Sequence, residues 1–136
     1  MVYLWSSGHI NISLVNRSVG RRIMATQIKE VIKQEYVKCA QDPSYFMKKY
    51  CVIQHPIQGK IPFALYDFQE KTIEDFIQHR FNIILKARQL GISSITAGYS
   101  LWMMTFHSDK NILVVATKQD TAKNLVTKVR FMHSNL

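Results

Sequence analysis

The sequence predicts an α/β fold in which a helical N-terminal segment precedes an incomplete parallel sheet. Two short apolar runs, at 82–87 and 111–116, are rich in branched residues and typical of buried strands. Each run is followed by a segment with helical periodicity, and this alternation of strand and helix is typical of α/β proteins. The chain has 136 residues, 47% of them hydrophobic, which suffices for one domain with its own core.

The first 23 residues differ from the rest of the chain. They contain no acidic residue, and their apolar residues follow no sustained period. Their arginines come after the apolar residues, whereas a signal peptide has its basic residues first, and no apolar stretch is long enough to span a bilayer. We expect residues 1–23 to be a poorly ordered, dispensable extension of unknown role and residues 24–136 to form the domain, with no membrane partner. An extension that survives limited proteolysis while the domain is cut would contradict this.

Two helices are predicted at the start of the domain. From Met24, Lys and Glu lie opposite a helical face on which apolar residues recur: Ile28, Val31, Ile32, Tyr36 and Cys39. Asp42 and Pro43 are typical of the N-cap and first position of a second helix. The expected buried face of this helix consists of Tyr45, Phe46 and Tyr50. Two prolines and a glycine within 55–63 then indicate a connecting loop.

Three further helices are predicted around the two strands. The first ends near His79, and its expected inward face is Leu65, Phe68, Thr72 and Phe76. The second lies between the strands and turns Ile95, Tyr99, Trp102 and Phe106 inward. The third follows a capping-box pattern formed by Thr117 and Asp120, and its inward residues are Ala122, Leu125, Val126 and Val129.

The segment 85–94, "LKARQLGISS", joins the first predicted strand to a helix. It nearly matches the phosphate-binding pattern Gly-x-x-x-x-Gly-Lys-Ser/Thr, with Gly91 as the second glycine and Ser93 as the hydroxyl. Ile92 stands in place of the lysine, and Lys86 in place of the first glycine. Helix N-termini bind anions through free N–H groups and the helix dipole. On the loop alone, a phosphate site and an ordinary strand-to-helix turn are equally supported.

A glutamine upstream favours the phosphate site. Gln69 lies at the start of the helix before the first strand, and its amide can match the donor and acceptor edge of adenine. A single glutamine on an amphipathic helix is usually only solvated. Some ATPases, however, place a glutamine at this distance before their phosphate loop.

The combination of segments resembles the large terminase subunit of tailed bacteriophages, the ATP-driven motor that packages DNA. "EYVKCAQDPSYFMKKYCVIQHPIQGKIPFALYDFQ" is similar to the segment before its ATPase core, "KARQLGISS" to its deviant Walker A loop, and "VVATKQDTAKNLVTKV" to the strand and helix that follow. The resemblance covers residues 25–132. It implies a P-loop NTPase-type fold that binds ATP and Mg²⁺.

The resemblance also implies site residues, partners and a location. Tyr66 and Gln69 would contact adenine, and the loop would hold the phosphates through Lys86, Ala87, Arg88, Gln89, Leu90, Gly91, Ile92, Ser93 and Ser94, with Ser93 as the magnesium ligand. Because Ile92 departs from the pattern, either Lys86 or Arg88 is the working cation. The implied partners are double-stranded DNA, the portal protein and the small terminase subunit. The implied location is the host cytoplasm, transiently at the procapsid portal.

Parts of a complete packaging enzyme are missing from these residues. No apolar run ends in Asp-Glu, the Walker B pattern, and no carboxylate cluster resembles the family's nuclease domain. We therefore assign no catalytic residue and expect this chain to bind ATP without hydrolysing it alone. The cysteines and the five histidines lack zinc-ligand spacing, so we expect no structural metal.

The charge is compatible with nucleic acid in every interpretation. The chain has 18 Lys and Arg against 9 Asp and Glu, a formal net charge of +9. A helicase-like ATPase also pairs a glutamine with a phosphate loop, but such helicases ordinarily keep Gly-Lys-Thr, and Ile92 counts against them. The third alternative is a non-catalytic basic domain that binds nucleic acid, with a coincidental loop.

Overall fold

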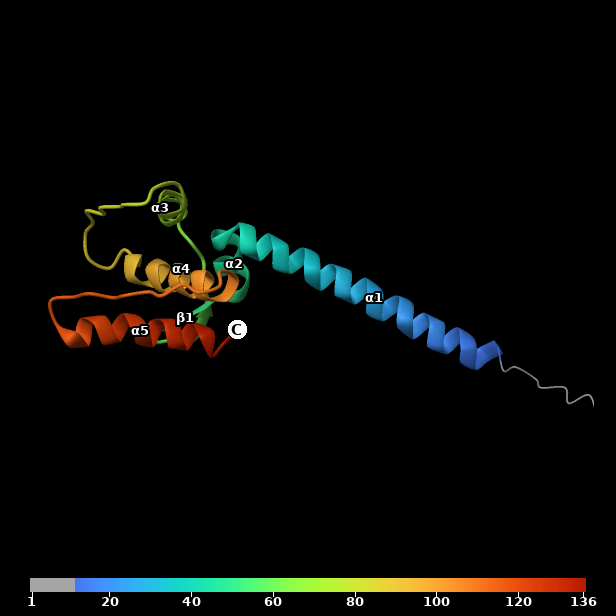
Figure 1. Ribbon diagram of the computed structural model, residues 1–136. Coiled ribbons are helices and arrows are strands. Elements are labelled where there is room, and N and C mark those ends of the chain that lie inside the picture. The colour runs from blue at the N-terminus through green and yellow to red at the C-terminus, as the bar shows by residue number, and fades with distance from the viewer. Residues whose placement is uncertain (1–11) are drawn as a thin grey trace, which may run out of the picture. The chain divides into compact units, whose positions relative to one another are not determined.

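The computed structural model describes residues 12–136 and divides the chain into two units, 1–36 and 37–136 (Figure 1). Helix α1, Ile12–Gln41, begins in the first unit and ends in the second. It starts before Met24, where the helical pattern was expected to begin. Residues 1–11 of the predicted extension lie outside the described residues. No helix within 12–136 is long and apolar enough to cross a membrane.

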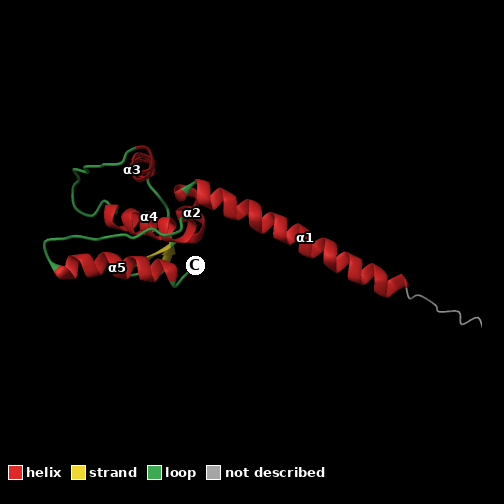
Figure 2. Cartoon of the chain, viewed as in Figure 1, coloured by secondary structure: helices red, strands yellow, loops and turns green. Residues whose placement is uncertain are grey.

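The second unit is mixed α/β but mostly helical (Figure 2). After α1 come α2 (Pro43–Tyr50), strands β1 (Val52–His55) and β2 (Gly59–Pro62), and then α3 (Asp67–Gln78), α4 (Ile92–Phe106) and α5 (Gln119–His133). All helices predicted from the sequence are therefore present. The sheet, however, is antiparallel and two-stranded, whereas the sequence predicts a parallel sheet.

The two strands form an antiparallel hairpin in the segment that we expected to be a loop. Val52 pairs with Pro62 and His55 with Gly59 across a turn at 56–58. Gly59 has φ +72°, a conformation that glycine adopts at little cost. Pro62 ends its strand on an edge of this two-stranded sheet, where proline is tolerated. The prolines and the glycine thus belong to a hairpin and not to an irregular connection.

The prediction of strands at 82–87 and 111–116 is wrong for this structure. Both segments are loops, and the hairpin is the only sheet within residues 12–136 (Figure 2). A strand is stable only beside another strand, and neither segment has one there. Their apolar side chains are correspondingly bare: Ile83 is 100% exposed and Leu113 is 87% exposed.

Helix α4 lies at the centre of the second unit and packs against α2, α3 and α5 (Figure 1). Its buried residues Ile95, Leu101 and Trp102 join a core that also includes Met47, Phe63, Ile73 and Met132. The Trp102 indole N–H donates a buried hydrogen bond of 2.7 Å to the Cys39 carbonyl, which fixes the end of α1 against α4. Both cysteines, Cys39 and Cys51, are buried and neither forms a disulfide.

Some local predictions are confirmed and others are not. Asp42 caps α2 by accepting a 3.0 Å hydrogen bond from the Tyr45 N–H, as expected. In α2, however, Met47 is buried and Tyr50 is exposed. Helix α5 has Lys118 at its N-cap, so Thr117 and Asp120 form no capping box there.

In helix α3 the buried residues lie one position after those predicted. It buries Gln69 and Ile73, whereas Phe68, predicted to face inward, is exposed. The burial of Gln69 is decisive for the candidate site.

Candidate functional site

The loop before α4 contains two residues with positive φ, Gln89 and Gly91. Gly91 is the N-cap of α4 and is left-handed, with φ +70° and ψ 6°. Gln89 also has a positive φ of 65°, which is uncommon for a residue with a side chain. Two left-handed residues so close together reverse the chain sharply before Ile92, the first residue of α4. Such turns gather backbone N–H groups at a helix start, where an anion is favoured.

Gln69 connects α3 to this loop. Its side chain is 3% exposed. The amide oxygen accepts a 3.1 Å hydrogen bond from the Tyr66 N–H, and the amide nitrogen donates a 3.0 Å hydrogen bond to the Leu90 carbonyl, 21 residues away. A Cβ atom at Gly91 would lie 2.6 Å from that amide nitrogen, so only glycine fits beside Gln69. Gln69 therefore holds the loop in place.

The same bonds restrict the predicted contact of Gln69 with adenine. Both ends of its amide are engaged with the backbone, which leaves one N–H and one oxygen lone pair for another partner. Tyr66, the N-cap of α3, is exposed and stacks on Phe68 with ring centroids 5.8 Å apart and planes at 7°. This exposed aromatic pair offers a flat surface beside Gln69 on which a base can stack.

The loop residues expected to contact phosphate are open to solvent. Lys86, Ala87, Arg88, Gln89 and Leu90 are all exposed, as is Ser93 in the first turn of α4. Neither Lys86 nor Arg88 forms an ion pair or hydrogen bond with another residue of the described chain. Either cation can therefore turn toward an anion at the loop, and the geometry does not separate them.

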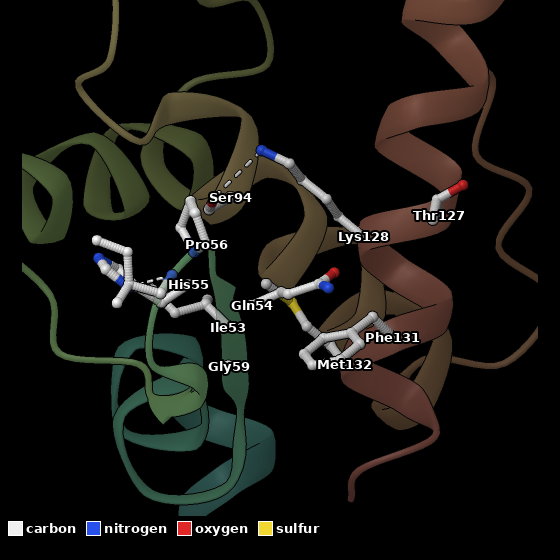
Figure 3. A pocket seen from close by; sticks show the side chains of 11 residues that line it. Ile53, Gln54, His55, Pro56, Gly59, Ser94, Thr127, Lys128, Phe131 and Met132 are labelled. Atoms are coloured by element: carbon white, nitrogen blue, oxygen red, sulfur yellow. Dashed lines mark hydrogen bonds between the residues drawn. The ribbon is translucent and has the colours of Figure 1, made fainter.

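A third cation reaches the start of α4, and sequence reasoning missed it. The Lys128 ammonium on α5 donates a 3.4 Å hydrogen bond to the Ser94 hydroxyl (Figure 3). Lys128 lies 34 residues after Ser94, so no local pattern indicates the contact. It depends on the packing of α5 against α4. Gln69 thus approaches the start of α4 from α3, and Lys128 approaches it from α5.

A cavity of about 530 Å³ lies beside Ser94, between the hairpin and α5 (Figure 3). Its polar lining includes Gln54, Ser94 and Lys128, and its apolar lining includes Ile53, Phe131 and Met132. This volume is within the range of small-molecule sites. No cavity was expected here from the sequence.

The residues of the loop suit phosphate better than they suit a resident metal. Within residues 12–136, no three His, Cys, Asp or Glu side chains are grouped so that they could hold a metal ion. A loop with a left-handed glycine, the Ser93 hydroxyl and nearby cations suits an anion that brings its own Mg²⁺. In that arrangement Ser93 would be one magnesium ligand, and phosphate oxygens would supply others.

No family model matches the chain.

The case for a function therefore depends on the loop and its neighbours. The structure brings together Gln69, Leu90 and Gly91, and it brings Lys128 to Ser94. It leaves Lys86, Arg88 and Ser93 exposed at the same loop.

Proposed function

We propose that the loop 86–94 binds the phosphates of ATP and that the chain is the N-terminal portion of a terminase-like DNA-packaging ATPase. The observation that carries the proposal is the hydrogen bond from Gln69 to Leu90 beside the left-handed Gly91. An ordinary turn needs no buried amide to hold it. A phosphate loop benefits from one, because its N–H groups must be fixed before the anion arrives.

The base and the phosphates of a bound nucleotide would lie at opposite ends of the contacts that run from Tyr66 through Gln69 to the loop before α4. The phosphates would lie at the start of α4, near Ser93 and the exposed cations Lys86 and Arg88. The base would lie against the exposed ring of Tyr66, whose backbone N–H donates to the buried Gln69. In this arrangement Gln69 would link the base region and the phosphate loop from below the surface, through its hydrogen bonds to Tyr66 and to Leu90.

The proposed fold of the whole ATPase is of the P-loop NTPase type with a parallel sheet. Its strands would include 82–87 and 111–116, which immediately precede the loop of α4 and the start of α5. In this proposal they pair with strands supplied from outside residues 12–136. The exposure of Ile83, Leu85 and Leu113 supports it, because three such apolar side chains gain about 1.5–3 kcal/mol each on burial.

The proposed partners follow from the resemblance and from the charge. Double-stranded DNA suits a net charge of +9 through phosphate contacts. The portal protein and the small terminase subunit, and a location in the host cytoplasm with transient docking at the procapsid portal, follow from the terminase resemblance alone.

Equilibrium binding of ATP to the purified chain tests the proposal. We expect ATP to bind more tightly than adenosine, because the loop contacts phosphates. Lys86→Ala is expected to weaken the affinity for ATP by about 10- to 150-fold, since a hydrogen bond to a charged group is worth about 1.5–3 kcal/mol. Arg88→Ala is expected to weaken it less, because Lys86 stands where some terminases carry their lysine.

A matched control separates the loop from general charge. Lys71 is an exposed lysine on α3, so Lys71→Ala removes the same charge away from the loop. It should leave the affinity for ATP unchanged. Equal affinities for ATP and adenosine, or equal effects of Lys86→Ala and Lys71→Ala, would refute nucleotide binding by the loop.

The exposed, unpaired loop cations also suit a second function, a non-catalytic basic domain that binds nucleic acid. A duplex would then compete for Lys86 and Arg88, and ATP would have no site. The two functions separate in one measurement. If the chain does not bind ATP and Lys86→Ala lowers its affinity for DNA, the basic domain is favoured. If the chain binds ATP clearly and Lys86→Ala lowers its affinity for DNA, the ATPase is favoured. Ile92 counts against the helicase-like alternative, because such helicases ordinarily keep Gly-Lys-Thr at this loop.

A further inference from the structure

The cavity between the hairpin and α5 has the composition of a binding site for a small anion. It combines an apolar wall of Ile53, Phe131 and Met132 with the polar side chains of Gln54, Ser94 and Lys128. Binding sites for small molecules typically have this mixture of apolar surface and a few convergent polar groups. Met132 is buried and anchors the wall to the core, so the cavity is part of the packed structure.

The charge inside the cavity is positive. Lys128 is the only Lys or Arg among the residues that line it, which also include His55 and no Asp or Glu. Lys128 also forms no ion pair with any residue of the described chain; its one hydrogen bond, 3.4 Å long, is to the neutral Ser94 hydroxyl. A lysine without a counter-ion beside a cavity is available to an anion. The cavity therefore favours an anionic ligand over a neutral one.

Three side chains with hydrogen-bond donors, from three different helices and strands, face the cavity (Figure 3). Ser94 accepts from Lys128, so its own O–H remains free to donate. Gln54 extends from β1 toward α5, and its amide group brings two further N–H donors (Figure 3). An ammonium, a hydroxyl and an amide together match the several acceptor oxygens of a phosphate group better than the two of a carboxylate.

We infer that this cavity binds a phosphate group through Lys128, Ser94 and Gln54. Two sources can supply the phosphate: the ATP proposed for the neighbouring loop, whose last phosphate would extend past Ser94, or a separate small phosphate compound. The inference rests on the proposed function only for the first source. In that case Lys128 supplies, from α5, the cation that Ile92 does not supply.

Binding of inorganic pyrophosphate and of ATP, measured separately by calorimetry on the full chain, tests the inference. Lys128→Ala should weaken pyrophosphate about tenfold, and Lys128→Arg should retain most of the affinity. Lys123→Ala is the matched control, because Lys123 is exposed on the same helix and does not line this cavity. The amide signals of Ser94 and Gln54 should shift in the NMR spectrum on titration with pyrophosphate.

The outcomes separate the two proposals. If Lys128→Ala weakens both ligands, the phosphate belongs to ATP; if it weakens pyrophosphate alone, the cavity takes a separate phosphate compound, and the inference holds in both cases. Pyrophosphate binding that depends on Lys128 in a chain that does not bind ATP refutes the proposed function alone. Absence of pyrophosphate binding, or equal losses in Lys128→Ala and Lys123→Ala, overturns the inference. Circular dichroism checks that each variant is folded.

Discussion

Replacing Gly91 by alanine tests the contact that holds the candidate loop. Two penalties are expected. The left-handed conformation, φ +70°, costs about 1 kcal/mol for a residue with a Cβ. The Cβ would also lie 2.6 Å from the Gln69 amide nitrogen, so that side chain must move and lose its hydrogen bond to Leu90. A buried amide left without a partner costs about 1–3 kcal/mol. The total loss of unfolding free energy is therefore about 2–4 kcal/mol.

Gly59 provides a control within the same chain. Its φ is +72°, nearly that of Gly91, but a Cβ there meets no atom within 4 Å. Gly59→Ala should therefore cost only the conformational part, about 1 kcal/mol. Urea denaturation of both variants measures the two losses, and their difference, about 1–3 kcal/mol, isolates the contact with Gln69.

A double-mutant cycle completes the test. In a Gln69→Ala background the clash and the hydrogen bond are both absent, so Gly91→Ala should cost no more than Gly59→Ala. The coupling energy between positions 69 and 91 is then about 1–3 kcal/mol. Equal losses for Gly91→Ala and Gly59→Ala, or a coupling energy near zero, would show that Gln69 does not support the loop. The proposed function would then lose its main observation.

Three other predictions follow from the core, from burial and from charge. Gly98→Ala should lower the unfolding free energy by about 1–3 kcal/mol, because a Cβ there would lie 3.0 Å from Met47 Cγ; an unchanged urea midpoint would contradict this packing. Burial raises the pKa of the Cys51 thiol from 9.0 to about 12, so its neutral form stabilises the fold fully below pH 9 and this stability is lost as pH rises from about 9 to 12. Urea midpoints across that range should fall less in Cys51→Ala, and parallel curves would argue against a buried neutral thiol. DNA affinity should fall steeply with added salt and show no sequence preference, and a flat salt dependence would exclude phosphate contacts as its source.

Local chemistry explains the parts of the fold that the sequence predicts well. Asp42 and Pro43 determine the start of α2, because a side-chain cap and a fixed φ act within a few residues. The run from Ile95 to Trp102 is so apolar that α4 must be buried whatever its neighbours are. The hairpin was missed because its strands are short and bounded by prolines, which also indicate loops.

The predictions that are wrong or incomplete concern interactions between residues far apart in the sequence. The apolar periodicity predicts that Phe68 faces the core and that Gln69 is available to a ligand. In the structure Phe68 is exposed, and the buried Gln69 amide donates a hydrogen bond to the Leu90 carbonyl. A buried polar side chain is acceptable only with such a partner, and a partner 21 residues away cannot be inferred from the pattern around Gln69. Lys128 was missed for the same reason. Its contact with Ser94 exists only because α5 packs on α4.

The exposed segments 82–87 and 111–116 are relevant both to the proposed fold and to the proposed phosphate-binding loop. Their composition is that of buried strands, yet within residues 12–136 they have no strand beside them. Bare branched side chains gain free energy on burial, which supports the proposal that further strands form a sheet that covers these segments. The loop and Lys128 do not depend on that sheet, because Gln69 and α5 already hold them from either side of α4. In the proposed function, phosphate binding would therefore need no completed sheet, whereas hydrolysis would need further positioned groups.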